Sequence, residues 1–91
     1  NIHFIKDNLF PTPPVFKAIQ SASKTDWKEM YKVFNMGHRM EIYCDQAQVQ
    51  TVIDTAAEFT IDARLIGKTE HSASGNQLSL SHGNDVFSYK N

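Results

Sequence analysis

A single stretch, from Thr25 to Cys44, sets the strongest limits on how this chain can fold. Its first half repeats apolar residues at the spacing of one helix face and places charged residues on the opposite face. The apolar positions are Trp27, Met30, Tyr31 and Phe34, and the polar positions are Lys28, Glu29 and Lys32. Thr25 can cap this helix with its hydroxyl group, and Asp26 adds a negative charge in the first turn. We expect the helix to end near Gly37, because glycine readily adopts the left-handed conformation that ends helices.

The second half of the stretch changes from helical to alternating periodicity. Met40, Ile42 and Cys44 would lie on one side of a strand, and Arg39, Glu41 and Tyr43 on the other. We expect the apolar side to be buried. Cys44 is the only cysteine, so it cannot form an internal disulfide, and it is expected to be a small buried residue of a protein in a reducing, cytoplasmic compartment.

Short periodic segments between turn signals predict the other elements. Strands are expected at residues 2–5, 40–44, 63–69, 77–81 and 86–89, and helices at residues 14–22, 25–34 and 45–59. Asp45 with Gln48 three residues later is a capping-box variant, and Gly83 with Asn84 is a hairpin signal. The order is therefore β-α-α-β-α-β-β-β. Because the last three strands have short connections, antiparallel pairing is expected, which favours an α+β fold with a mixed sheet.

Size, charge and motif content exclude several classes of protein. The 91 residues are enough for one domain, and a net charge of −1 without a basic stripe argues against a nucleic-acid partner. No apolar run approaches the roughly 20 residues that span a bilayer, so no membrane partner is expected. His3, His38, His71 and His82 lack the spacing of a zinc site, and His71 and His82 are expected in turns. Neither a nucleophile elbow nor a phosphate loop is present.

Two segments of the chain carry a family resemblance. PTPPVFKAIQ at residues 11–20 and EMYKVFNMGHRM at residues 29–40 resemble the C-terminal domain of the aminoimidazole ribonucleotide synthetases, the phosphoribosylformylglycinamidine cyclo-ligases of purine biosynthesis. The matching positions are Pro13, Pro14, Phe16, Gln20, Glu29, Met30, Tyr31, Phe34, Asn35, Met36 and Gly37. Arg39 is a departure, because family members often carry a second glycine there. The resemblance implies that residues 1–91 are one piece of a larger enzyme, the C-terminal part of its C-terminal domain.

The resemblance also implies an activity and a fold. The full enzyme would be a cytoplasmic homodimer that uses ATP to close the ring of aminoimidazole ribonucleotide from formylglycinamidine ribonucleotide, a small-molecule substrate. ATP and Mg²⁺ would be bound mainly by an N-terminal domain outside this chain, so the chain alone is expected to be inactive and to hold no cofactor. The fold would be a mixed sheet layered with helices, partly ferredoxin-like. Two alternatives remain: a related synthetase of the same superfamily, for selenophosphate or formylglycinamidine ribonucleotide, and a stand-alone ferredoxin-like module that binds a small molecule.

Asn35, Gly37 and Arg39 are the candidate substrate-binding residues. In the family this turn faces a cleft between two domains, so Asn35 would present its amide to substrate and Gly37 would permit close approach. The guanidinium fork of Arg39 suits the ribose phosphate of the family's substrate. The alternatives are that the turn only caps a helix and that Arg39 is an exposed strand residue that pairs with Glu41 or with a neighbouring strand. The sequence does not identify a catalytic base.

Self-association is expected from the first strand. If residues 2–5 belong to a larger sheet, the isolated chain exposes an unpaired edge there, and such edges recruit other strands. Phe4→Lys would then shift the chain toward monomer.

Overall fold

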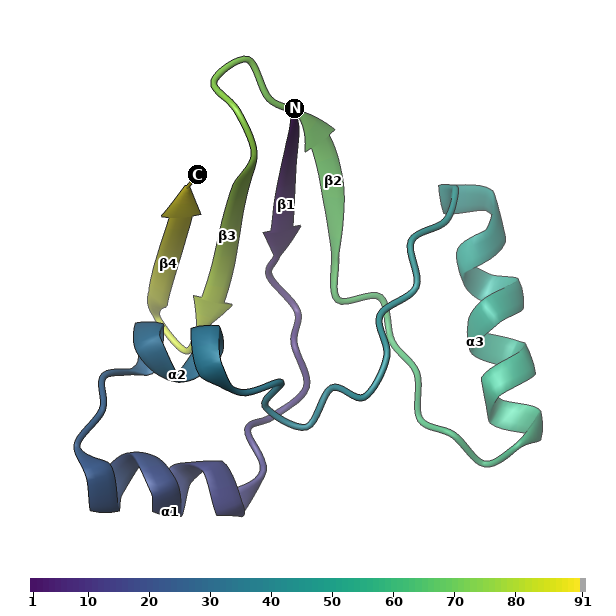
Figure 1. Cartoon of the computed structure of the whole chain (residues 1–91). Helices are drawn as coiled ribbons and strands as arrows, with labels where there is room; N and C mark the ends of the chain where they lie inside the picture. Colours follow the sequence, from purple (N-terminus) through teal and green to yellow (C-terminus); the bar gives the residue numbers. More distant parts are fainter. Residues whose placement is uncertain (91) are drawn as a thin grey trace.

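The computed structural model describes residues 1–90, which form one four-stranded sheet and three α-helices (Figure 1). In chain order the elements are β1 (Ile2–Lys6), α1 (Pro14–Ser23), α2 (Trp27–Val33), the short 3-10 helix η1 (Gln46–Gln48), α3 (Val49–Glu58), β2 (Gly67–His71), β3 (Gln77–His82) and β4 (Asp85–Lys90). The predicted α+β class is confirmed, since helices accompany a mixed sheet.

The sheet has the strand order β2-β1-β3-β4. β1 runs antiparallel to β2 and parallel to β3, and β3 and β4 form the predicted hairpin around Gly83 and Asn84. β2 and β3 do not pair with each other despite their short connection, because residues 72–76 pass over the start of β1, where Ser72 N–H donates to the Asn1 carbonyl at 3.0 Å. β1 is therefore paired on both sides. The expected open edge at residues 2–5 is wrong, while self-association itself stays a prediction.

The predicted strand at residues 40–44 is also wrong within the described residues. A strand needs a neighbour to complete its hydrogen bonds, and no backbone group of residues 39–44 bonds to another backbone group in residues 1–90. The side predicted to be buried is open, with Met40 79 % and Ile42 58 % exposed and the Cys44 thiol exposed as well. The alternating pattern of these residues therefore does not by itself predict that the segment is buried or paired in a sheet.

Helix starts follow the available capping groups. α1 begins at Pro14, whose fixed φ angle suits the first helical turn. The N-cap of α2 is Asp26 and not Thr25, because the Asp26 carboxylate accepts the Glu29 N–H at 2.9 Å and is the stronger acceptor at a helix N-terminus. The expected capping box at Asp45 and Gln48 does not form, since neither side chain caps η1 or α3.

The apolar face predicted for α2 is confirmed. Met30 is 1 % exposed, while Trp27, Tyr31 and Phe34 are half-buried. The Trp27 ring stacks on the imidazole of His82 with centroids 4.5 Å apart, and the Tyr31 hydroxyl shares a 2.9 Å hydrogen bond with His82 Nδ1. His82 therefore ends β3 within this packed cluster and His71 ends β2, so neither is a turn residue.

β2 begins later than the sequence predicts, at Gly67 and not at position 63. The Ile66 carbonyl accepts the N–H groups of Asp7 at 3.1 Å and Asn8 at 2.9 Å, just beyond β1. These bonds turn the chain out of the sheet, so residues 61–66 remain irregular.

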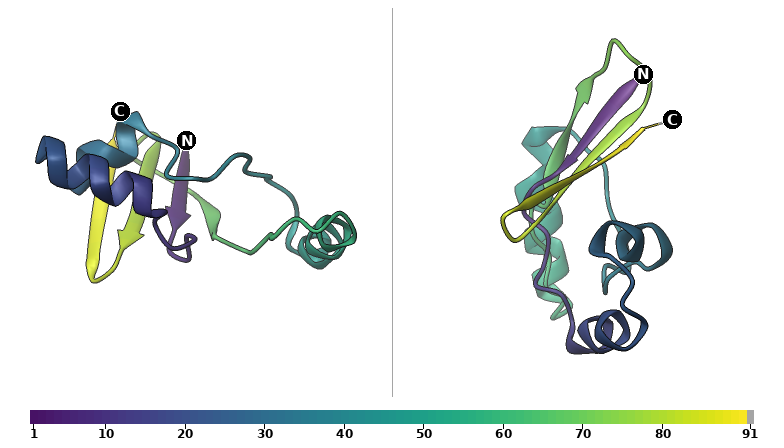
Figure 2. Two further views of the ribbon diagram at one scale, coloured as in Figure 1. Left: turned by 90° about the horizontal axis from the view of Figure 1, so that it is seen from below. Right: turned by 90° about the vertical axis from the view of Figure 1, so that its left-hand side faces the viewer.

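The helices lie in two places. α1 and α2 lie near the lower end of β3 and β4 in Figure 1, and α3 stands apart beyond β2 in Figure 1 and in the left view of Figure 2. The link between α2 and α3, residues 34–45, consequently crosses from one side of the molecule to the other past the end of β1.

Candidate functional site

The turn after α2 is a structural unit of its own. α2 ends at Val33, and Phe34, the C-cap, is extended. Asn35 Oδ1 accepts the Gly37 N–H at 2.9 Å, and the His38 N–H donates to the Asn35 carbonyl at 3.1 Å. Met36 and Gly37 both have positive φ angles, of 55° and 89°. Gly37 therefore shapes this turn. It does not cap the helix, so the simpler interpretation of the sequence, in which this glycine is only a helix cap, is wrong.

Gly37 lies directly against the proline segment. A Cβ atom added at Gly37 would come within 2.7 Å of Pro13 Cγ, closer than real Cβ contacts allow. Met36, the residue before it, is only 2 % exposed. The two segments that carry the family resemblance thus meet in space. The turn is held in place by packing against Pro13, the residue just before α1.

A hollow of about 370 Å³ opens beside this turn. The predicted residues Asn35 and Arg39 both line it, whereas Gly37 does not. Its other lining residues are Lys6, Leu9, Tyr31, Phe34, His38, Met40, Glu41, Leu78 and Leu80. The structure therefore brings two of the three predicted site residues together and adds charged groups from β1 and the link that sequence reasoning missed.

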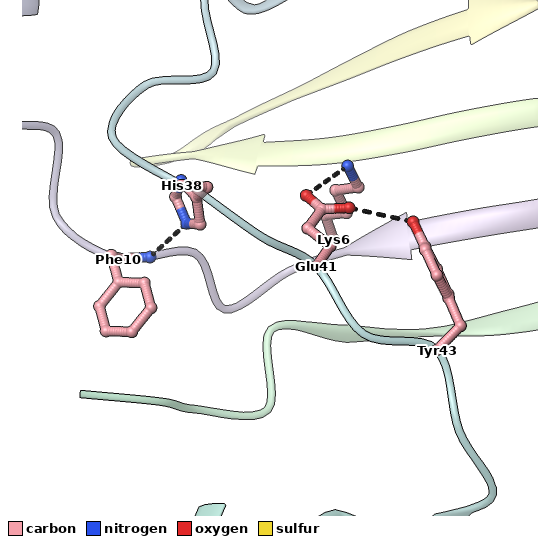
Figure 3. A network of polar contacts seen from close by, with 5 residues as sticks. All are labelled: Lys6, Phe10, His38, Glu41 and Tyr43. Carbon is pink, nitrogen blue, oxygen red and sulfur yellow. Dashed lines mark hydrogen bonds and ion pairs between the residues drawn. The ribbon is translucent and has the colours of Figure 1, made fainter. Parts of the chain in front are cut away.

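His38 is held by the segment after β1. The Phe10 N–H donates to His38 Nε2 at 3.3 Å, and the Phe10 and His38 rings lie 5.4 Å apart between centroids (Figure 3). Because Nε2 accepts this bond, a neutral His38 carries its proton on Nδ1, where it can donate. No local motif pointed to His38, since its partner is 28 residues earlier in the chain.

Lys6, Glu41 and Tyr43 form a short polar chain at the end of β1 (Figure 3). Lys6 Nζ donates to Glu41 Oε1 at 2.8 Å, and the Tyr43 hydroxyl donates to Glu41 Oε2 at 3.0 Å. Burial raises the pKa of the Glu41 carboxyl, but the bond and charge of Lys6 and the bond from Tyr43 outweigh it, so the net pKa is lowered. Burial, together with Glu41, raises the pKa of Tyr43. Glu41 is thus neutralised by Lys6. The pair between Arg39 and Glu41, which was the alternative expected from the sequence, does not form.

The lowered pKa of Glu41 predicts a pH dependence of stability. An ionised Glu41 stabilises the fold above its unfolded pKa, near 4.5, and this contribution is lost as the pH falls through the lower folded value. Because the pair is partly exposed, Glu41→Gln should cost only about 1 kcal/mol or less at pH 7. We expect the wild-type advantage in urea unfolding to shrink between pH 5 and pH 3.

Glu70→Gln is the matched control, because Glu70 pairs with Lys68 at 3.1 Å on the exposed edge of the sheet. A Glu41→Gln penalty that is constant from pH 7 to pH 3 would contradict the assignment of Glu41 as an ionised partner of Lys6.

A second, wider groove of about 670 Å³ lies on the other side of the link. The apolar face of α3 forms one wall, with Val49, Val52, Ile53 and Ala56, and Phe4 and Phe10 lie opposite. Arg64 lies over the Phe10 ring at 4.5 Å and donates to the Leu9 carbonyl at 3.2 Å, so its guanidinium is engaged at the rim.

Residues 1–90 contain neither a metal-binding cluster nor a membrane-spanning helix. No three His, Cys, Asp or Glu side chains gather closely enough there to hold a metal ion. Among the same residues, no helix is both long enough and apolar enough to span a bilayer.

Comparison with known proteins gives one consistent name, although no family model matches the chain. The chain is 37 % identical over 59 residues to phosphoribosylformylglycinamidine cyclo-ligase from Staphylococcus carnosus (strain TM300), a match covering 65 % of the chain and 17 % of the relative. It is 29 % identical over 70 residues to the protein of that name from Methanopyrus kandleri, covering 77 % and 20 %. For the Methanococcus vannielii protein the values are 34 % over 64 residues, covering 70 % and 18 %. This chain is a homologue of part of the phosphoribosylformylglycinamidine cyclo-ligases.

The resemblance to the cyclo-ligases inferred from residues 11–20 and 29–40 is therefore confirmed. The chain spans about a fifth of the length of these curated cyclo-ligases. Their name consequently describes a much larger protein, of which this chain matches one part.

Proposed function

We propose that this chain is part of an ATP-dependent cyclo-ligase that converts formylglycinamidine ribonucleotide to aminoimidazole ribonucleotide in purine biosynthesis. The observation that carries this proposal is the homology to relatives that all bear the cyclo-ligase name. The contact between Gly37 and Pro13 adds support, because it joins the two resembling segments into one surface. Cytoplasmic location and homodimerisation of the complete enzyme belong to the same proposal.

Within this proposal, Arg39 binds the phosphate of the substrate. Arg39 is exposed at the hollow and forms no ion pair within residues 1–90, because Glu41 is already paired with Lys6. A free guanidinium presents a planar fork that matches two phosphate oxygens. Lys6 thus acts as a positioning residue, since its ion pair engages the Glu41 carboxylate.

Asn35 would orient the rest of the substrate. Its Oδ1 is committed to the Gly37 N–H, while its amide nitrogen has no hydrogen-bond partner within residues 1–90 and is exposed. An amide nitrogen fixed through its own oxygen is a directed donor for a carbonyl or ribose oxygen. Holding the substrate at two points in this way favours ring closure by restricting its conformations.

ATP, when bound, supplies the phosphoryl group that activates the substrate's amide oxygen for ring closure. We propose that ATP and Mg²⁺ are bound by a part of the enzyme outside residues 1–91. The 91-residue chain should therefore show no turnover and no micromolar ATP binding by calorimetry. Micromolar binding of ATP to this chain alone would contradict the proposed division of roles.

The function is tested on the complete polypeptide that contains this chain. Purified protein, supplied with ATP, Mg²⁺ and formylglycinamidine ribonucleotide, should form aminoimidazole ribonucleotide, which is detected as a diazotisable aromatic amine. Product should appear only when ATP is present. Absence of product from folded protein at saturating substrate would overturn the proposed function.

A further inference from the structure

His38 carries one hydrogen-bond donor that the fold leaves free. A backbone N–H can only donate, so the bond from the Phe10 N–H makes His38 Nε2 the acceptor and keeps a hydrogen on Nδ1 (Figure 3). Nδ1 has no hydrogen-bond partner within residues 1–90, although every buried side-chain nitrogen or oxygen of these residues has one. Nδ1 therefore lies where solvent or a ligand can reach it.

The imidazole ring of His38 is held in one orientation. It is half-buried, and its centroid lies 5.4 Å from that of the Phe10 ring. Arg64 lies over the same Phe10 ring at 4.5 Å and donates to the Leu9 carbonyl at 3.2 Å, which holds this segment against the turn. A donor on a ring that is already fixed loses little conformational freedom when a ligand binds to it.

The free polar atoms around the 370 Å³ hollow are donors. Asn35 and His38 share one arrangement, because in each a backbone N–H occupies the acceptor atom and the donor nitrogen has no partner within residues 1–90. Arg39 adds a guanidinium, which has donors only. Among the described residues that line the hollow, Glu41 is the one carboxylate, and both of its oxygens already accept hydrogen bonds. Such a set of donors suits an anion.

We propose that His38 binds the phosphate of the substrate through its Nδ1–H, together with the Arg39 guanidinium. This inference rests on the proposed function, in which Arg39 holds that phosphate. A phosphate group has three acceptor oxygens, so the fork of Arg39 engages two of them and leaves the third for His38. Both residues line the same hollow. His38 thereby favours the phosphorylated substrate over the same molecule without its phosphate.

Two amide substitutions separate the roles of the two ring nitrogens. The amide nitrogen of asparagine is bonded to Cγ, as Nδ1 is in histidine, whereas the amide of glutamine lies one bond further out, near the position of Nε2. His38→Asn therefore keeps the donor and loses the bond to Phe10, and His38→Gln keeps that bond and loses the donor. In the complete protein, the KM for formylglycinamidine ribonucleotide should rise about tenfold in His38→Gln and stay within about threefold in His38→Asn.

A purely structural role for His38 predicts the reverse order. If the imidazole only holds Phe10, His38→Gln should match the wild type and His38→Asn should be impaired. That result, or equal KM values for the two variants, would overturn the proposal. His71→Gln is the matched control, because His71 is exposed at the end of β2, and its KM should stay within about twofold of the wild type. Circular dichroism checks that each variant is folded.

Binding of ribose 5-phosphate separates this inference from the proposed function. Calorimetry on the complete protein measures this binding without turnover, and the dissociation constant should rise about tenfold in His38→Gln and change little in His38→Asn. If the wild type binds ribose 5-phosphate in this pattern but forms no product, the proposed function alone is wrong. If the wild type forms product and His38→Gln binds ribose 5-phosphate as tightly as the wild type, the role of His38 is overturned.

Discussion

Met30→Ala should lower the free energy of unfolding of this chain by about 2–5 kcal/mol. Met30 is 1 % exposed and is one of only a few buried apolar side chains among the described residues, together with Met36 and Leu80. Removing its side chain leaves a cavity that so small a core cannot readily close. A domain of this size has only about 5–15 kcal/mol of stability in total, so the loss should be a large fraction. Urea unfolding followed by circular dichroism measures it.

Lys32→Ala is the matched control on the same helix. Lys32 is exposed on the opposite face of α2, and its only ion-pair partner within residues 1–90, Glu29, lies 3.7 Å away at the surface. This change should stay within about 0.5 kcal/mol. Similar small losses for both variants would show that the face of α2 assigned here to the core is not buried.

Gly67→Ala should destabilise the chain by about 3 kcal/mol through a steric effect on the sheet. A Cβ atom at Gly67 would lie 1.8 Å from the Ile5 carbonyl oxygen and 2.9 Å from Lys6 Cα, both backbone atoms of the central strand β1. Backbone cannot rotate away as a side chain can, so the first β1–β2 pairs must separate. The same urea experiment should show a lower midpoint.

Gly75→Ala separates this clash from an ordinary effect of replacing glycine. Gly75 has a φ angle of 91°, and a Cβ atom there would meet nothing within 4 Å. Its cost is therefore the conformational strain alone, about 1–2 kcal/mol. A loss at Gly67 no greater than that at Gly75 would contradict the close approach of β2 to β1.

Local patterns predicted those features that depend on near neighbours in the chain. The apolar face of α2 and the β3–β4 hairpin are examples, because residues three or four apart in a helix, or two apart across a turn, determine them. The N-cap was misplaced by one residue, since Thr25 and Asp26 are both good caps and only the geometry decides between them.

Long-range pairing was the part that the sequence could not predict. β1 lies between β2 and β3, and the residues that pair with it are more than 60 positions later in the chain. No periodicity within residues 2–5 indicates which strands will flank it. At residues 40–44 the alternating pattern correctly predicts that the Glu41 and Tyr43 side chains lie on the same side of the segment. It contains no information on whether a neighbouring strand is present to pair with the segment.

The same contrast between local patterns and long-range contacts applies to the candidate site. The turn at Asn35 and Gly37 and the neighbouring Arg39 were predicted as candidate site residues from the sequence, whereas Lys6 and His38 were not. Lys6 meets Glu41 across 35 positions, and the bond between Phe10 and His38 spans 28. Only the folded path of the link past the end of β1 brings these groups together (Figures 1 and 3).

The KM of the complete protein for formylglycinamidine ribonucleotide, compared between wild type and Arg39→Gln, tests most directly whether this turn binds substrate. We expect KM to rise about tenfold or more with kcat nearly unchanged, because a charge-assisted bond present in both ground and transition state is lost. Lys17→Gln, an exposed substitution on α1, should leave KM within about twofold, as expected for a surface change away from the site. A KM for Arg39→Gln equal to that of Lys17→Gln would contradict the binding of substrate at this turn.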